Sequence, residues 1–278
     1  MTELIIDGHA HALAEFSTIE SILEIMSVAG VDKIILCPGG GGENSSYKPI
    51  RPKPLKISLM YNQRIHFLSN RFMRFTSRKI GDRDFGNIFV NKLVQALPDK
   101  LIQFYWVNPL DNDYFEKMVE AYKKWHYKGI KLHQCIIPFS NNGPEVKKIA
   151  QFAQENTLPV FIHVFSSKEA DRLIDLAREF PKTNFIIAHL MGFDNVFRKG
   201  KDLSNIYFDI SPYYITSNKR ILKAVKQFGS DHVILGSDTP FGIDNLKNNI
   251  QRVKNIPELT EEQKKMILGR NISHLLNL

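Results

Sequence analysis

The chain has 278 residues, of which 43% are hydrophobic and 24% are charged, and its formal net charge is +8. This composition is typical of a globular protein and excludes a disordered chain, while two cysteines, Cys37 and Cys135, are too few for a disulfide scaffold. No apolar run reaches the roughly 18 residues of a membrane span, and the first residues lack the pattern of a secretory signal. We therefore expect a cytoplasmic protein that does not bind a membrane.

Eight short runs of β-branched and aromatic residues alternate with amphipathic segments along the chain. The predicted strands are residues 4–11, 31–37, 101–108, 129–134, 159–165, 184–190, 206–211 and 233–240. Their starts are 22 to 30 residues apart, the length of a βα unit, except for one interval of 70 residues. Eight such units predict an α/β fold, a (β/α)8 TIM barrel formed by a single domain over residues 1–278, with a doubly wound open sheet as the alternative.

Several of the predicted helices have end signals. Ser17 and Glu20 form the sequence pattern of a capping box ahead of the first helix, and Gly30 is placed to end it. Thr260 and Gln263 repeat the capping-box pattern ahead of the last helix. The alternation of strands with capped helices supports the barrel prediction.

The long interval, residues 39–100, is predicted to be an insertion or lid in the second βα loop. It begins with glycines at positions 39–42, contains a helix near residues 88–97, and has ten basic residues against one acidic residue between positions 48 and 83, a net charge of +9. The glycines do not continue as a phosphate-binding loop. We expect Phe67, Phe72 and Phe75 to form the apolar face of a helix that covers the barrel or a second subunit, which leaves a homo-oligomer open.

Polar side chains stand at the C-terminal ends of five predicted strands. His9 and His11 alternate with alanine, so in a strand they project to the same face. The other strand ends are occupied by Lys131, His133, His163, His189 and Asp238. A barrel brings these ends together at one mouth, where the active sites of this fold lie. Because packing does not explain five polar strand ends in register, we predict a metal site.

The segments HAH, KLH, FIHV, IIAHLMG and ILGSDTPFG occur in this order over nearly the whole chain. They resemble the amidohydrolase superfamily of metal-dependent hydrolases, especially its amidohydrolase 2, or amidohydrolase-related, branch. The resemblance implies that a divalent metal is bound by His9, His11, His163 and Asp238. His189 would either bind a second metal or hydrogen-bond the nucleophilic water or the substrate. Zn²⁺ is the ion that we expect, although other divalent ions fit the same donors.

A bound divalent ion lowers the pKa of water and polarises a carbonyl group. We therefore expect a metal-dependent hydrolase that uses metal-activated water on an ester, lactone, amide or related carbonyl compound. Asp238 and His189 are the expected catalytic residues, with Asp238 as general acid and base. The alternative implied by the same resemblance is a non-oxidative decarboxylase or hydratase of a carboxylate substrate. The basic insertion suits an anionic small molecule in either case.

Lys131 has two interpretations. In binuclear members of the superfamily a carboxylated lysine on this strand bridges two metals, so Lys131 would be a metal ligand. Otherwise it is a plain lysine that pairs with an aspartate or with a substrate carboxylate. One metal per chain is the simpler expectation, and two would accompany the bridge. We expect the substrate to contact His133, Asp209 and Tyr213.

A nucleic-acid partner is the least favoured alternative. Basic and aromatic residues interleave in the insertion, and TatD-like nucleases share the His-x-His start. Those enzymes typically have a glutamate on the fourth strand, where this chain has Lys131 and His133. The sequence therefore favours a small-molecule substrate.

Overall fold

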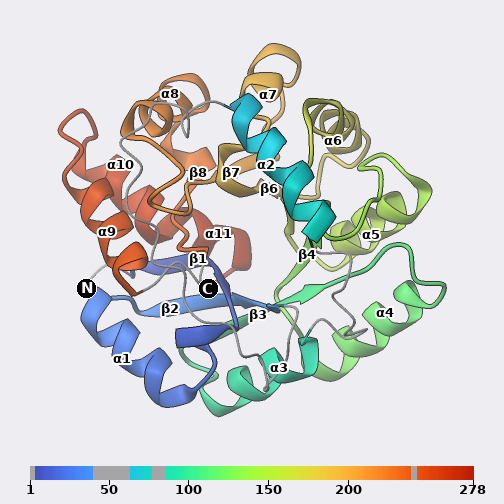
Figure 1. Ribbon diagram of the computed structural model, residues 1–278, viewed down its shortest axis with the longest axis horizontal. Helices are drawn as coiled ribbons and strands as arrows, with labels where there is room; N and C mark the ends of the chain where they lie inside the picture. The colour runs from blue at the N-terminus through green and yellow to red at the C-terminus, as the bar shows by residue number, and fades with distance from the viewer. Residues whose placement is uncertain (1–3, 40–62, 77–85, 239–242) are drawn as a thin grey trace.

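The computed structural model describes residues 4–39, 63–76, 86–238 and 243–278 of the chain (Figure 1). In these residues eight strands form one sheet, and each strand pairs in parallel with the next along the chain. The strands are β1 (Ile6–His11), β2 (Lys33–Cys37), β3 (Leu101–Trp106), β4 (Gly129–His133), β5 (Val160–His163), β6 (Phe185–Ile187), β7 (Ile206–Asp209) and β8 (Val233–Ile234). Each lies within a predicted strand range, so the strand predictions are confirmed.

The sheet curls until its two edge strands meet. Beyond β8 the chain continues beside β1, where Gly8 N donates to Leu235 O at 2.9 Å and Ser237 N donates to His9 O at 3.0 Å. No side chain fits at Gly8, because its Cβ would lie 2.7 Å from Leu235 O. The eight parallel strands therefore form a nearly closed (β/α)8 TIM barrel, as predicted, and not a doubly wound open sheet.

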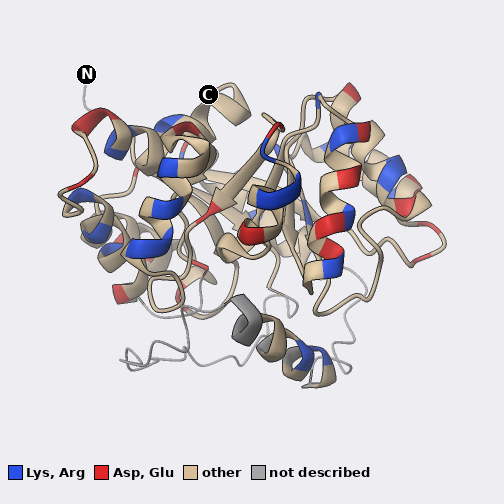
Figure 2. Ribbon diagram, turned by 90° about the horizontal axis from the view of Figure 1, so that it is seen from above, with Lys and Arg blue, Asp and Glu red and all other residues tan. Residues whose placement is uncertain are grey.

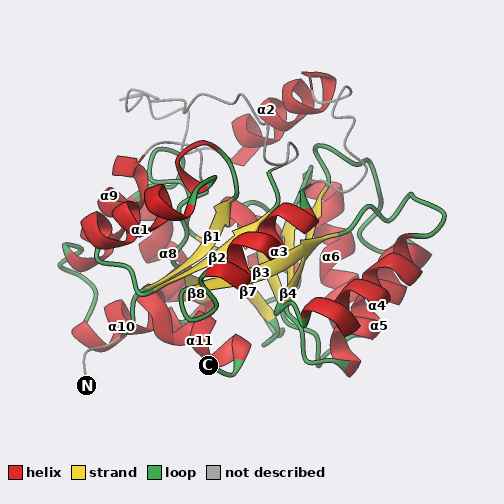
Figure 3. Ribbon diagram, turned by 90° about the horizontal axis from the view of Figure 1, so that it is seen from below, coloured by secondary structure: helices red, strands yellow, loops and turns green. Residues whose placement is uncertain are grey.

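Helices surround the strands (Figure 1, Figure 3). They are α1 (Ile19–Ala29), α2 (Gln63–Thr76), α3 (Asn87–Ala96), α4 (Tyr114–Trp125), α5 (Pro144–Glu155), α6 (Ser167–Glu179), α7 (Phe193–Lys199), α8 (Asn218–Phe228), α9 (Ile243–Lys254), α10 (Glu261–Lys265) and α11 (Asn271–Leu276). Shorter helical turns are η1 (Ala14–Phe16), η4 (Ala188–Leu190), η5 (Ser230–His232) and the π-helical η6 (Met266–Arg270). Helix α3 confirms the helix predicted near residues 88–97. Within the described residues no helix has both the length and the apolar character needed to cross a membrane.

The start of α1 differs from its prediction by one residue. The capping box predicted at Ser17 and Glu20 is wrong, because Thr18 is the N-cap and its hydroxyl accepts from Ser21 N at 3.3 Å. The hydroxyl of Ser17 donates instead to Ala14 O at 2.5 Å. Ser17 and Thr18 both have a hydroxyl group that could cap α1. Because the Ser17 hydroxyl bonds to η1, Thr18 is the N-cap.

The capping box at the start of α10 is confirmed. Gln263 N donates to Thr260 Oγ1 at 3.2 Å, and Thr260 N donates to Gln263 Oε1 at 2.9 Å. We expect Thr260→Ala to lower the free energy of unfolding by about 1 kcal/mol, because the Gln263 amide loses its acceptor. Urea unfolding measures the change, and Thr260→Ser is the control that keeps the hydroxyl. An unchanged free energy in Thr260→Ala would show that water replaces the cap without cost.

The barrel interior changes from apolar to polar along the strands. Phe104, Phe161 and Ile186 are fully buried there in one apolar cluster. The Phe104 ring fills the space beside Gly129, where a Cβ would lie 2.5 Å from it. Alternation along β5 puts His163 on the same face as Phe161, one step nearer the carboxyl end. An apolar floor therefore lies directly beneath the polar strand ends.

The structure describes part of the predicted insertion, residues 39–100. Figure 2 and Figure 3 show α2 at one end of the barrel, apart from the ring of helices. Phe67 packs against the core, whereas Phe72 is 72% exposed and Phe75 is 71% exposed. Phe72 and Phe75 therefore do not cover the barrel, which contradicts the first alternative of the prediction. Contact of these two rings with a second subunit, the other alternative, stays a prediction. Most of the basic segment lies outside the described residues, as do the glycines at positions 40–42.

Candidate active site

The predicted site residues lie at or just beyond the carboxyl ends of the strands. β6 and β8 are shorter than predicted, ending at Ile187 and Ile234, so His189 and Asp238 lie in the turns that follow. Both have positive φ angles, 58° for His189 and 54° for Asp238. This left-handed conformation is uncommon outside glycine, and it clusters at functional sites. Asp238 Oδ1 nevertheless lies 3.6 Å from His9 Nε2, so the turns keep these residues at the barrel mouth.

Three donor atoms converge at this mouth. His9 Nε2 is 3.2 Å from His11 Nε2, and Asp238 Oδ1 is 3.6 Å from each of them. Atoms that bind one zinc ion tetrahedrally at about 2.1 Å are roughly 3.4 Å apart, so the three atoms are spaced as ligands of one ion. Imidazole and carboxylate are also donor types that divalent metals such as zinc accept.

Hydrogen bonds fix the tautomers of three imidazoles. Each donates its Nδ1 proton to a protein oxygen: His9 to Asp209 Oδ2 at 3.1 Å, His11 to Pro38 O at 2.7 Å, and His189 to Ser211 O at 2.8 Å. Because a neutral imidazole has one donor and one acceptor nitrogen, each Nε2 keeps its lone pair. Metal-binding histidines use this arrangement, in which a carboxylate or carbonyl holds the second nitrogen.

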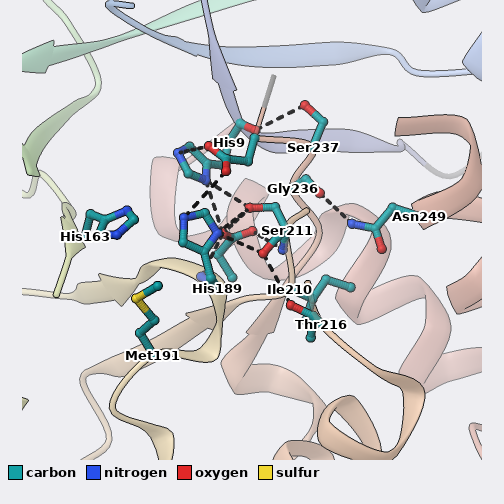
Figure 4. Close-up of polar contacts among 12 residues, drawn as sticks. His9, His163, His189, Met191, Ile210, Ser211, Thr216, Gly236, Ser237 and Asn249 are labelled. Atoms are coloured by element: carbon teal, nitrogen blue, oxygen red, sulfur yellow. Dashed lines mark hydrogen bonds and ion pairs between the residues drawn. The ribbon is translucent and has the colours of Figure 1, made fainter. Parts of the chain in front are cut away.

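Asp209 and Ser211 form a buried unit behind two of these rings. Asp209 Oδ2 accepts from Ser211 Oγ at 2.5 Å and from His189 N at 3.2 Å, and Asp209 Oδ1 accepts from Ser211 N at 2.9 Å. Ser211 Oγ also lies 3.1 Å from His9 Nδ1 and 3.2 Å from His189 Nδ1 (Figure 4). Neither Asp209 nor Ser211 is exposed. Asp209, which we expected to contact substrate, thus contacts the histidines here.

Lys131 and His133 occupy the inner face of β4. Lys131 is fully buried, and its Nζ is 2.8 Å from His9 Nε2. The His133 ring stacks between Trp106 and His163, with centroids 5.5 Å and 4.2 Å away. His133 Nδ1 is buried and has no hydrogen-bond partner among the described residues. A buried polar atom without a protein partner is suited to a ligand.

His163 and Tyr213 lie at the edge of the cluster. The His163 ring centroid is 4.9 Å from that of His189, and His163 Nε2 is 3.2 Å from Asn70 Oδ1. In the described residues His163 belongs to neither group of metal-type donors within 4.8 Å of one another, which are His9, His11 and Asp238, and His9, His189 and Asp209. Tyr213 is partly buried in the loop after β7, where its N donates to Asn245 Oδ1 at 2.8 Å.

Burial keeps the histidines of this site neutral. Burial lowers the pKa of His11 to about 3 and that of His189 to about 4, and it lowers the pKa of His9 and His163 as well. It also lowers the pKa of Lys131 and raises the pKa of Asp238 to about 7. In each case the charged form loses hydration. Neutral imidazoles are the form that binds a metal ion, so the protonation state of the histidines fits the donor geometry.

Two further residues, Asp7 and Asn70, support the site and were not among the predicted site residues. Asp7 is fully buried: its Oδ1 accepts from His9 N at 3.2 Å and from Ser237 N at 2.9 Å, and its Oδ2 accepts from Ser237 Oγ at 2.6 Å. It therefore ties β1 to the chain beyond β8. A carboxylate inside an otherwise apolar strand was the available signal. Asn70 contacts His163 from α2, where no sequence signal marks it.

The fold and the site together define a TIM-barrel enzyme with a candidate metal centre at its mouth. A family model described as amidohydrolase matches residues 6–278, so the chain belongs to the amidohydrolase family, as the resemblance implied. Metal dependence is typical of that family, and the histidine and aspartate groups described above could bind an ion. A comparison with curated proteins finds no match.

Similar solved structures cover almost the whole chain at low identity. A 2,6-dihydroxybenzoate decarboxylase from Rhizobium has a TM-score of 0.67 and 13% identity, with 99% of both chains covered. A 5-carboxyvanillate decarboxylase from Sphingomonas paucimobilis has a TM-score of 0.66 and 13% identity over 100% of both chains. A probable 2-pyrone-4,6-dicarboxylic acid hydrolase from Acinetobacter baumannii, with citric acid bound, has a TM-score of 0.67 and 15% identity over 99% of both chains. These likenesses establish the shared fold.

Proposed function

We propose that the chain is a metal-dependent enzyme that acts on a small carboxylate-bearing substrate at the barrel mouth. The observation that carries this proposal is the spacing of His9 Nε2, His11 Nε2 and Asp238 Oδ1, which are 3.2 to 3.6 Å from one another. These residues would hold one divalent ion, with His163 as a further imidazole donor beside it. Zn²⁺ suits this donor set best. When bound, the ion supplies a Lewis acid that polarises a carbonyl group and acidifies water.

Asp238 is the residue that moves a proton. Its Oδ1 faces His9 and His11, whereas its Oδ2 lies 3.6 Å from His189 Nε2. Oδ2 is therefore the atom that takes a proton from the attacking water and returns it to the leaving group. His189 Nε2 accepts a hydrogen bond, because Nδ1 donates to Ser211 O. This nitrogen orients the water beside Asp238.

Lys131 supplies the charge that favours an anionic substrate. Its Nζ is buried beside His9, and a positive charge away from water attracts a carboxylate more strongly than an exposed one does. The unpaired Nδ1 of His133 offers a polar contact on the same strand. The alternative is a carboxylated Lys131 that bridges two metal ions. The number of ions per chain distinguishes this alternative from a plain lysine.

Hydrolysis of an ester, lactone or amide is the reaction that we propose first. Decarboxylation is the second candidate, because two of the similar structures are named as decarboxylases. In that reaction the bond between carbon and the carboxylate breaks, its electron pair stays on the carbon, and CO2 leaves. The carbon then takes a proton from Asp238. Both reactions use the same arrangement of carboxylate and histidine.

Two measurements test the proposal. Plasma mass spectrometry on protein purified without chelator is expected to find one ion per chain, and its loss in His9→Ala. A panel of small carboxylates is then turned over in deuterated oxygen-18 water: hydrolysis puts one labelled oxygen into the stable products, whereas decarboxylation releases CO2 and puts one deuterium on the carbon that carried the carboxylate. If no metal binds even after incubation with zinc or manganese, the proposed function is wrong.

Lys131→Met is expected to keep one ion per chain and to raise the KM for a carboxylate substrate by about 10- to 100-fold, because a charged hydrogen bond is lost. Metal content and steady-state kinetics measure the two effects separately. Lys128→Met is the matched control, since Lys128 is exposed just before β4. Two ions in the wild type that fall to one in Lys131→Met would contradict the plain lysine and support the carboxylated bridge.

A further inference from the structure

Helix α2 lies at one end of the barrel (Figure 2, Figure 3), and two of its polar side chains, Asn70 and Arg74, contact the loops after β4 and β5. Asn70 and Arg74 are four residues apart and therefore share a face of the helix. Asn70 is fully buried, whereas on the opposite face Leu68 is 64% exposed and Phe72 is 72% exposed. A surface helix normally buries its apolar stripe. The buried polar groups of α2 therefore need specific partners on the barrel.

Asn70 uses both ends of its side-chain amide at the barrel mouth. Its Nδ2 donates to Val164 O at 3.0 Å and to Phe165 O at 3.2 Å, in the loop after β5. Its Oδ1 lies 3.2 Å from His163 Nε2. Because carbonyl oxygens can only accept, the NH2 group must face the two carbonyls and Oδ1 must face the histidine.

The same rule places the proton on His163. An amide oxygen only accepts, so His163 Nε2 must donate, and Nδ1 keeps the lone pair of the neutral ring. The opposite tautomer, protonated on Nδ1, is found in His9, His11 and His189. The nitrogen with a free lone pair is therefore Nδ1 in His163 and Nε2 in the other three histidines.

We propose that Asn70 is a positioning residue of the active site, whose amide oxygen holds the proton on His163 Nε2 and leaves Nδ1 as the coordinating nitrogen. This inference rests on the function proposed above for the identity of the ion. An outer hydrogen bond of this kind fixes the tautomer of a metal-binding histidine and raises its basicity. Through Asn70 the insertion supports the metal centre from outside the barrel.

Arg74 holds α2 in the place that this role requires. Its Nη2 donates to Gln134 O at 2.5 Å, and its guanidinium carbon lies 3.4 Å from the centroid of the Phe165 ring. Gln134 and Phe165 lie just beyond β4 and β5. These contacts locate α2 relative to two strand ends, so Asn70 meets His163 at a defined distance.

Nitrogen-15 NMR of histidine-labelled, metal-free protein measures the tautomer, and His163→Gln assigns the signal. In the wild type we expect His163 to be protonated on Nε2. Asn70→Leu removes the acceptor at similar volume, so we expect a mixture of tautomers and a metal affinity lower by about 10- to 100-fold. Asn70→Asp keeps the acceptor oxygen and is expected to retain the Nε2 proton, with a loss of stability because an oxygen then faces Val164 O and Phe165 O.

Asn195→Leu is the matched control, because Asn195 is also a buried helical asparagine, whose Nδ2 donates to Ser167 O at 3.1 Å. It is expected to leave the tautomer and the metal affinity unchanged. A wild-type His163 protonated on Nδ1 would overturn the proposal without any variant, as would an unchanged tautomer in folded Asn70→Leu. If the wild type binds no metal, the proposed function fails, while the metal-free tautomer result still decides the role of Asn70.

Discussion

Asp238→Asn is expected to lower kcat by about three orders of magnitude, within the range attributed to a general acid and base. Asparagine has the shape of the carboxylate but cannot take up a proton from water and return it. Its amide oxygen can still face His9 and His11, so we expect metal binding to weaken without being lost. Single-turnover rates at saturating metal, on a carboxylate that the wild type converts, separate the chemical effect from metal occupancy.

The matched control for this experiment is Asp231→Asn. Asp231 lies in η5 just before β8, and its side chain is 63% exposed. We expect this variant to keep the wild-type rate and metal content. If Asp238→Asn at full metal occupancy kept a rate within about tenfold of the wild type, a role as general acid and base would be excluded. The proton would then have to move through another group, and His189 Nε2, 3.6 Å from Asp238 Oδ2, is the first to test.

The barrel could be predicted because each βα unit leaves two signals, an apolar run and an amphipathic segment. The exact residues at which β6 and β8 end were harder to predict. Residues 188–190 continue the apolar run of β6, yet the chain turns there, with His189 at a φ of 58°. Asp238 lies beyond β8 for the same reason. Such turns are set by hydrogen bonds to other strands, which the periodicity of one segment does not report.

The position of the histidines could be predicted because side chains that meet at a barrel mouth must stand at strand ends. The residues that hydrogen-bond to these histidines could not be predicted. Asp209 reaches His9 across 200 residues of sequence, so its contact depends on the closed barrel and on no local pattern. Asp7 had a local signal, a carboxylate within a buried strand, but its partner Ser237 is 230 residues away.

The orientation of helix α2 was the least predictable feature of the described residues. The phenylalanines of α2 suggested an apolar face toward the barrel or a second subunit, yet Phe72 and Phe75 are exposed in this chain and Asn70 is buried against the barrel. Hydrogen bonds from Asn70 to the carbonyls after β5 decide this orientation. A hydrophobic pattern reports only which apolar side chains are expected to be buried. It therefore does not predict the orientation of a helix that is held by the hydrogen bonds of a buried amide.

Asp209→Ala is expected to lower the free energy of unfolding by about 3–5 kcal/mol, because several buried donors lose their acceptor at about 1–3 kcal/mol for each group left unsatisfied. Its carboxylate is fully buried and accepts hydrogen bonds from His9, Ser211 and His189. Alanine leaves these donors without an acceptor in the protein interior. Because His9 then loses the group that fixes its tautomer, we also expect the metal affinity to fall by about 10- to 100-fold.

Asp209→Asn separates the charge from the hydrogen bonds. It keeps one acceptor oxygen but turns an NH2 group toward donors, so we expect a smaller loss of stability, about 1–3 kcal/mol. Urea unfolding of metal-free protein measures stability, and competition with a chelator measures metal affinity. Asp202→Ala is the control, because Asp202 is 71% exposed and its ion pair with Arg178 is worth little. A wild-type metal affinity in Asp209→Ala would show that His9 keeps its tautomer without the carboxylate, and Ser211 Oγ, 3.1 Å from His9 Nδ1, would then be the acceptor that holds it.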